Sequence, residues 1–204
     1  PAALIQKVVT AMIVLVGVLF VTGALFEGET INMMPLFTQA DTGVVAGIVA
    51  VLVMVPFLFV GFDVIPQAAE EINLPYKAIG KVLMMSVILA VVWYALIILA
   101  TSLALNSTEL AASSLSVPDA MGSLFNAPWA SNLMVLAGIA GIITSWNAFY
   151  IGGSRAIYAL ARAGMLPAPF AKLHPRYKTP TNAIFLMGFL SCIAPFFGRP
   201  ALVW

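Results

Sequence analysis

Charged residues are scarce in this chain. Lys, Arg, Asp and Glu make up 8% of its 204 residues, whereas hydrophobic residues make up 62%. A water-soluble domain has about 25% charged residues, because its surface is largely polar. The mean hydropathy of +1.06 therefore predicts an integral membrane protein with the lipid bilayer as its main solvent. The net charge of +1 creates no field that attracts nucleic acid, so no nucleic-acid partner is expected.

Cysteine and histidine are also nearly absent. The single cysteine, Cys192, lies in an apolar run, which excludes an intrachain disulfide and argues against a cysteine-based metal site. The single histidine, His174, lies among basic loop residues and is expected to be solvated. The sequence has no His-Glu-x-x-His motif and no paired catalytic groups at one membrane depth, so an enzyme is not expected.

Long apolar runs occupy most of the chain. A helix needs about 20 apolar residues to cross the hydrocarbon core, and helices are expected because an open strand edge would leave backbone groups unpaired in lipid. The runs predict one partial transmembrane domain over 1–204, with spans at about 3–26, 43–65, 79–105, 129–151 and 182–204. The chain starts without Met and ends without an evident stop, so we expect an internal piece of a longer protein.

The loops between these spans separate by charge. Loops 27–42 and 106–128 carry acidic residues and no Lys or Arg, whereas loops 66–81 and 152–180 carry the basic loop residues. Positively charged loops remain cytoplasmic. The pattern predicts a multi-pass protein of the cell membrane with 66–81 and 152–180 inside and the other two loops outside.

Three shorter features are predicted outside the spans. The fourth helix is expected to continue to about Ala163 and to be capped by Gly164. A short helix is expected at Pro118–Phe125, with proline in its first turn. A short amphipathic segment is expected at Pro169–Leu173.

The second span contains residues that disfavour a lipid-facing helix. Pro56 lacks a backbone donor, Gly61 has a low helix propensity, and Asp63 costs a few kcal/mol at membrane depth. One interpretation is a proline kink that shapes packing, with Asp63 bonded to a neighbouring helix. The other is a discontinuous helix whose free carbonyls and helix ends bind a polar solute, as in transporters.

Two motifs resemble the amino acid–polyamine–organocation (APC) superfamily of permeases. FLFVGFD, followed by AAEE and INLPYKAIGK, is similar to the family's sixth transmembrane helix and the loop after it. GGSRAIYALARAGMLPAPFAKLHPRYKTPTNAI is similar to the end of the eighth helix, about 90 residues later, as in the family. The chain thus resembles the region from the family's fifth helix to its ninth.

The resemblance implies an all-α integral membrane protein with a partial leucine-transporter-type fold, about five transmembrane helices and one discontinuous helix. It implies secondary active transport of amino acids by alternating access; the alternatives are a permease for polyamines or other small amines, and an amino acid exchanger. The first helix of the family binds the substrate carboxylate and is missing here, so the rest of the polypeptide is an expected partner. No cofactor is expected beyond a coupling proton or sodium ion.

The family pattern also assigns substrate-binding positions. Backbone carbonyls near Phe57, Leu58 and Val60 would accept hydrogen bonds from the substrate ammonium group, and Gly61 would permit the unwinding. Phe57 is a candidate gate, or alternatively an ordinary core or lipid-facing residue. Trp146 and Asn147 are expected to line the cavity from the other side.

Coupling and gating positions follow from the same resemblance, each with an alternative. Asp63 would couple protonation to gating, or bond the exposed amides of the half-helix. Glu70 or Glu71 would pair with Arg155 or Lys81 as an inner gate, or be solvated. Thr144 and Ser145 would bind sodium, or bond to the carbonyl one turn earlier.

Two further classes are less favoured by the sequence. A channel would be expected to show rings of polar residues, which this sequence does not suggest. A structural membrane subunit would not need Gly61, Phe62 and Asp63 in the middle of a span.

Overall fold

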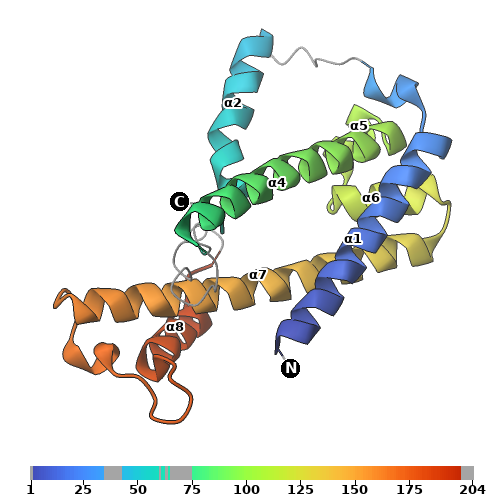
Figure 1. The fold of residues 1–204 in the computed structure, drawn as a ribbon. Coiled ribbons are helices and arrows are strands. Elements are labelled where there is room, and N and C mark those ends of the chain that lie inside the picture. Colours follow the sequence, from blue (N-terminus) through green and yellow to red (C-terminus); the bar gives the residue numbers. More distant parts are fainter. Residues whose placement is uncertain (1, 35–42, 60, 63, 65–74, 199–204) are drawn as a thin grey trace. The chain divides into compact units, whose positions relative to one another are not determined.

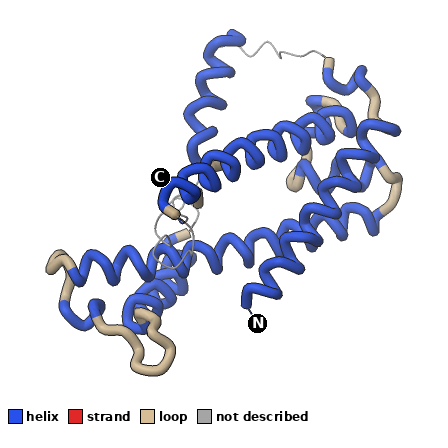
Figure 2. The backbone as a smooth tube through the Cα atoms, viewed as in Figure 1, coloured by secondary structure: helices blue, strands red, loops and turns tan. Residues whose placement is uncertain are grey.

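A computed structural model describes residues 2–34, 43–59, 61–62, 64 and 75–198. The described residues form helices joined by turns and loops, without a β-strand (Figures 1 and 2). They divide into two compact units. Unit 1 covers the described residues up to Phe59 and from Val82 to Thr144, and unit 2 covers those from Gly61 to Lys81 and from Ser145 onward.

Five helices and two partial ones make up the helical part of unit 1. They are α1 (Ala2–Glu27), the 3-10 helix η1 (Thr30–Met33), α2 (Gly43–Leu58), α5 (Ser107–Ala112) and α6 (Ser116–Leu124), with most of α4 (Tyr76–Ala104) and the first half of α7 (Pro128–Arg162). The core of unit 1 is formed by apolar residues of α1, α4, α6 and α7. Phe20 of α1 and Met121 of α6 are fully buried within it.

Small residues of α1 allow large side chains to approach closely. A Cβ added to Gly17 would lie 2.3 Å from Cζ2 of Trp93 in α4, which is closer than atoms can approach. A Cβ added to Gly23 would lie 2.6 Å from Cζ of Phe125, just after α6. Glycine at these two positions therefore lets the rings pack directly against the α1 backbone, as in other membrane helix pairs.

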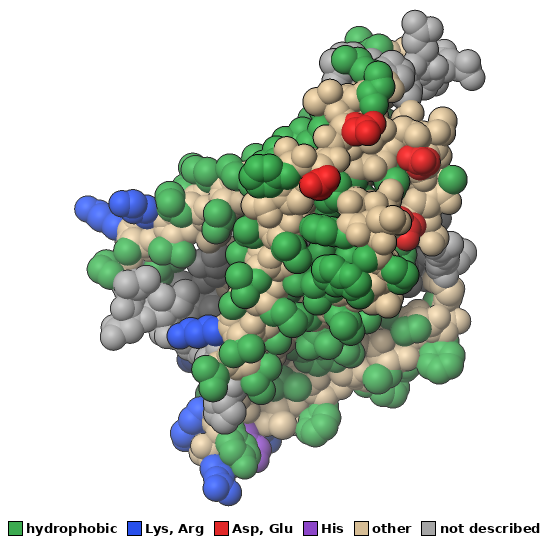
Figure 3. Space-filling view, turned by 90° about the vertical axis from the view of Figure 1, so that its right-hand side faces the viewer, with side chains coloured by type: hydrophobic (Ala, Val, Ile, Leu, Met, Phe, Trp, Pro, Cys, Tyr) green, Lys and Arg blue, Asp and Glu red, His purple; other side chains and the backbone are tan. Residues whose placement is uncertain are grey.

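The turn after α1 is tied to the end of α4. The backbone amide of Glu29 and the side-chain Nδ2 of Asn32 both donate to the carbonyl of Leu103, at 3.1 and 2.9 Å. The acidic residues described in unit 1 lie at this end, where α1 and α4 stop: Glu27, Glu29, Glu109 and Asp119. Figure 3 shows acidic side chains gathered there on one face. Lys7 lies near the opposite end of α1.

The loop after α4 contains a helix that we did not predict. Asn106 caps α5: its side chain accepts from the amides of Thr108 and Glu109, while the Glu109 carboxylate accepts from the Asn106 amide. This is a capping box, a reciprocal pair of bonds that satisfies the free amides of a helix start. The predicted helix at Pro118–Phe125 corresponds to α6, which begins at Ser116 and ends at Leu124.

The end of α7 agrees with the sequence-based expectation. Gly164 adopts a φ of +78°, its amide donates to Ala161, and the amide of Met165 donates to Leu160. This pair of bonds is a Schellman motif, which requires a residue in the left-handed region. The prediction that α7 continues past the span and is capped by Gly164 is confirmed.

Unit 2 continues from α7 into a loop and one further α-helix. It contains the 3-10 helix η3 (Ala168–Ala171), α8 (Thr181–Ile193) and the 3-10 helix η4 (Ala194–Phe197), together with the start of α4 and the second half of α7. The amphipathic segment expected at Pro169–Leu173 is thus a single 3-10 turn shifted toward the N-terminus. The Asn182 side chain donates to the carbonyl of Pro169 at 2.8 Å and so joins α8 to η3.

Three of the described helices are long and apolar enough to cross a membrane: Leu4–Glu27, Lys77–Ala104 and Pro128–Arg162. Two apolar helical segments are shorter, Gly43–Pro56 and Thr181–Phe197. Many large apolar side chains are exposed along these helices, including Leu15, Leu89 and Ile142. Exposed side chains of this kind suit contact with lipid or with further helices.

Candidate functional site

The helix of the second span stops at the segment where the sequence predicted a break. α2 contains Pro56 and ends at Leu58, and the amide of Phe59 turns back to the carbonyl of Pro56 at 3.2 Å. Gly61 has a φ of +116°, and its carbonyl accepts from the amide of Val64 at 3.2 Å. A residue with a side chain rarely adopts this φ, so glycine permits the turn.

The end of α2 offers the chemistry that a substrate ammonium group needs. The last four carbonyls of an α-helix lack intrahelical partners and carry partial negative charge. Phe57 and Leu58 belong to this last turn, although their side chains are not among those described. Four predicted residues, Val60, Asp63, Glu70 and Glu71, lie outside the described residues.

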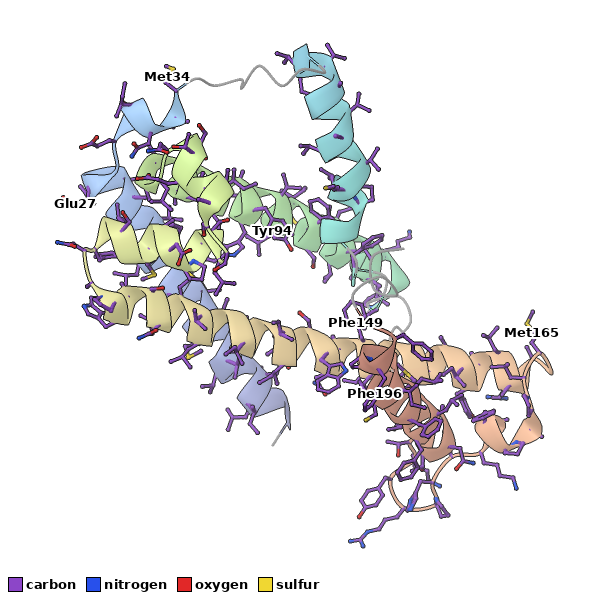
Figure 4. The ribbon with its side chains drawn as sticks, turned by 180° about the vertical axis from the view of Figure 1, so that it is seen from behind. Glu27, Met34, Tyr94, Phe149, Met165 and Phe196 are labelled. Carbon is purple, nitrogen blue, oxygen red and sulfur yellow. The ribbon has the colours of Figure 1, made fainter. Side chains whose placement is uncertain are left out.

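An aromatic contact holds the end of α2 to α4. The rings of Phe59 and Tyr94 meet edge to face, with centroids 5.7 Å apart and planes at 87°. Such pairs contribute about 0.5–1.5 kcal/mol beyond the area that they bury. Tyr94, labelled in Figure 4, therefore holds Phe59, the residue that follows α2, against α4.

A second aromatic residue lies beside Gly61. A Cβ added to Gly61 would lie 3.7 Å from Cζ and 3.9 Å from Cε1 of Phe149, which is ordinary van der Waals contact. Phe149 projects from α7 (Figure 4) and is 40% exposed. One edge of the ring therefore faces the turn while part of the ring remains open.

The predicted cavity residues Trp146 and Asn147 are both exposed on α7. The Trp146 ring meets Tyr150 edge to face, with centroids 5.7 Å apart. The Tyr150 hydroxyl oxygen lies 3.5 Å from the position of a Cβ on Gly188 of α8. One helical turn later, Met187 Cε lies 2.6 Å from the position of a Cβ on Gly153. This part of α7 is thus packed closely against α8.

The two hydroxyl residues predicted as sodium ligands lie next to each other on α7. The Thr144 hydroxyl donates to the carbonyl of Gly141 at 2.9 Å, as the alternative interpretation expected. Its oxygen retains lone pairs that can accept or coordinate. Ser145 is exposed. No cluster of three or more His, Cys, Asp or Glu that could hold a metal ion occurs among the described residues.

The basic partners of the predicted inner gate lie on two helices. Arg155 is half-buried on α7 and already takes part in an interaction, and Lys81 is exposed near the start of α4. Ser154, next to Arg155, is 3% exposed and donates to the carbonyl of Ile151 at 3.1 Å. Because Glu70 and Glu71 lie outside the described residues, the gate remains a prediction.

Phe149 and Tyr150 were not among the residues predicted from the sequence. Both belong to a stripe with Trp146 and Gly153, at the spacing i, i+3, i+4 and i+7 that defines one face of a helix. That spacing is visible in the sequence WNAFYIGG. The contact between Phe149 and Gly61 is not visible in the sequence, because the two residues lie far apart along the chain.

The chain belongs to the amino acid permease family, whose model matches residues 2–199. It is similar to the vacuolar cationic amino acid transporter 8 of Arabidopsis thaliana, with 30% identity over 94% of this chain and 32% of the relative. The branched-chain amino acid permease BcaP of Bacillus subtilis is 25% identical over 93% of this chain and 40% of the relative. The methylthioribose transporter of the same bacterium is 26% identical over 91% and 39%.

The family membership shows that the chain is part of an APC-type membrane permease with an all-α fold. The chain spans about a third to two fifths of the length of these relatives. All three are named as transporters or permeases, and none is named as an enzyme.

Proposed function

We propose that the protein containing this chain carries amino acids across the cell membrane by secondary active transport with alternating access. The observation that carries the proposal is the end of α2 at Leu58 followed by Gly61 at φ +116° within an otherwise apolar segment. Membership of the amino acid permease family supports the same function.

The substrate amine binds at the break around residues 57–61 in this proposal. A helix C-terminus presents carbonyl oxygens and the negative end of the helix dipole, which together attract an ammonium group. In a low-dielectric environment such a charge-assisted hydrogen bond is stronger than in water. Trp146 and Asn147, exposed on α7, supply further cavity surface.

Ion coupling and membrane orientation belong to the same proposal. Asp63 couples a proton, or Thr144 and Ser145 contribute to a sodium site, while Glu70 or Glu71 pairs with Arg155 or Lys81 in the closed state. Loops 66–81 and 152–180 face the cytoplasm because they hold the basic residues of the loops. The family's first helix, supplied by the rest of the polypeptide, completes the site.

The relatives' names set the range of substrates that we consider. They name cationic amino acids, branched-chain amino acids and methylthioribose. We favour amino acids because two of these three names specify them. The alternatives are transport of polyamines or other small amines, and exchange of one amino acid for another.

The test is uptake of radiolabelled solutes into proteoliposomes containing the full-length protein. The panel contains arginine, lysine, leucine, valine, putrescine and methylthioribose, with a proton gradient or a sodium gradient applied separately. We expect one gradient to drive accumulation of an amino acid.

The Asp63→Asn variant addresses coupling in the same assay. We expect it to abolish gradient-driven accumulation, because the asparagine amide, unlike the Asp63 carboxylate, does not bind and release a proton near neutral pH. Asp119→Asn, which neutralises an exposed acid of α6, is the matched control and should retain accumulation. Uptake of no panel member under either gradient would contradict the transport proposal, and unchanged accumulation by Asp63→Asn would remove Asp63 from the coupling step.

A further inference from the structure

The turn at Gly61 is formed by a glycine, which has no side chain that could pack against neighbouring residues and stabilise the turn. Glycine populates positive and negative φ about equally, so a turn built on it is easily redistributed among conformations. Among the described residues other than its neighbours in the chain, only Phe149 has atoms within 4 Å of the position where a Gly61 side chain would begin. The edge of that ring therefore lies directly beside the turn, at ordinary van der Waals distance from the Cβ position of Gly61.

The Phe149 ring is itself carried by a well-fixed part of α7. Trp146, Phe149, Tyr150 and Gly153 form one stripe of the helix, which we call the aromatic stripe. Tyr150 meets Trp146 within the stripe and approaches Gly188 of α8, and Gly153 accepts the close approach of Met187. The contacts of Tyr150 and Gly153 hold the part of α7 that directly follows Phe149 against α8.

We propose that Phe149 is a positioning residue for the break after α2, and that its ring stabilises the left-handed conformation of Gly61 through direct packing. In this proposal the ring contacts neither the coupling ion nor the substrate. It acts by keeping the break in its binding-competent conformation. The inference rests on the proposed function, because the break matters for transport only if the substrate binds there.

The population of the binding-competent conformation sets the expected effect. The apparent affinity of a site falls in proportion to the fraction of molecules that are competent to bind. We expect Phe149→Ala in the full-length protein to raise the KM for uptake about threefold to tenfold, while kcat changes by less than about twofold. Phe149→Tyr retains the ring and should restore the KM of the unmodified protein.

Hydrogen–deuterium exchange gives a readout that does not require transport. In Phe149→Ala we expect faster deuterium uptake in peptides that cover residues 55–64, because the turn opens more often. Phe189→Ala is the matched control, since it removes an equally large ring from an exposed position of α8. It should leave both the KM and the exchange of these peptides unchanged.

The two measurements separate the two proposals. Unchanged exchange at residues 55–64 in Phe149→Ala, or an equal increase in Phe189→Ala, would overturn the positioning role whatever the transport assay shows. Absence of any uptake by the unmodified protein would contradict the proposed function, whereas the exchange comparison would still decide whether Phe149 holds the turn.

Discussion

At the scale of single residues, Gly164 shows how one position ends a long helix. The carbonyls of Leu160 and Ala161 would lack partners at the end of α7 without the turn that follows. Gly164 at φ +78° brings the amides of Met165 and Gly164 back to them, at 3.0 and 3.1 Å. A Cβ added to Gly164 would meet nothing within 4 Å, so the requirement is one of backbone conformation and not of space.

The Gly164→Ala variant tests that requirement. We expect it to lower the free energy of unfolding by about 1–2 kcal/mol, the usual cost of placing an L-residue with a Cβ in the left-handed region. The measurement is the thermal unfolding temperature of the detergent-solubilised full-length protein. Gly164→Asn is the matched variant, because asparagine tolerates this conformation, and should lose less. Equal losses of stability in Gly164→Ala and Gly164→Asn would mean that the backbone conformation of Gly164 does not cause the destabilisation.

At the scale of helices, α1 and α4 are fitted to each other through Gly17 and Trp93. The Trp93 ring takes the volume that any side chain at position 17 would fill, with Cζ2 and Cη2 at 2.3 and 2.6 Å from the position of a Cβ. Val16 and Phe20 of α1 are buried in the same core. The distance between the two helices is thus set by the small Gly17 of α1 and the large Trp93 ring of α4, which fit together.

The variant Gly17→Ala should separate the two helices. We expect a loss of about 1–3 kcal/mol of stability, the usual cost of overpacking a well-packed core. Trp93→Leu should relieve most of the clash, so the double variant should lose less than the sum of the single ones. Unfolding temperatures of the three variants measure this coupling.

Gly138→Ala is the control, because a Cβ there meets nothing within 4 Å. If the stability losses of Gly17→Ala and Trp93→Leu simply add in the double variant, the result would argue against a direct contact between the two residues.

The helices also show what the sequence could predict. The end of α7 was predictable because its cause is local: Gly164 is followed by Pro167 within three residues. The short helix α5 was missed although the Asn106–Glu109 capping box is readable in the sequence, since six residues form no hydrophobic period. The contact of Phe149 with Gly61 was not predictable, because it joins positions far apart in the chain and depends on how the helices pack.

At the scale of the whole molecule, charge and helix direction agree along each long helix. Lys7 lies near the start of α1 and Glu27 at its end; Lys77 and Lys81 lie near the start of α4, which ends beside the acidic turn. Arg155 and Arg162 lie in the last third of α7. Each of these helices therefore has its basic residues at the end that the proposed topology assigns to the cytoplasm.

This orientation predicts which loops an impermeant reagent can reach. In a Cys192→Ser background of the full-length protein, lacking other accessible cysteines, a Ser114→Cys variant should react with an impermeant maleimide added to intact cells. Lys172→Cys should react only after the cells are opened. Both positions are exposed, so the difference reports the side of the membrane and not burial. Reaction of Lys172→Cys in intact cells would reverse the proposed topology.

The loop between α7 and α8 is built more firmly than its polarity suggests. Nδ1 of His174 accepts from the amides of Arg176 and Tyr177, at 3.2 and 3.3 Å, the amide of His174 donates to Thr179, and Asn182 is bonded to Pro169. A binding protein raised against the exposed turn 175–178 would consequently be attached to a turn with defined hydrogen bonds beside the start of α8. For electron microscopy of the full-length protein in detergent, this turn is a natural place to attach a marker for particle alignment.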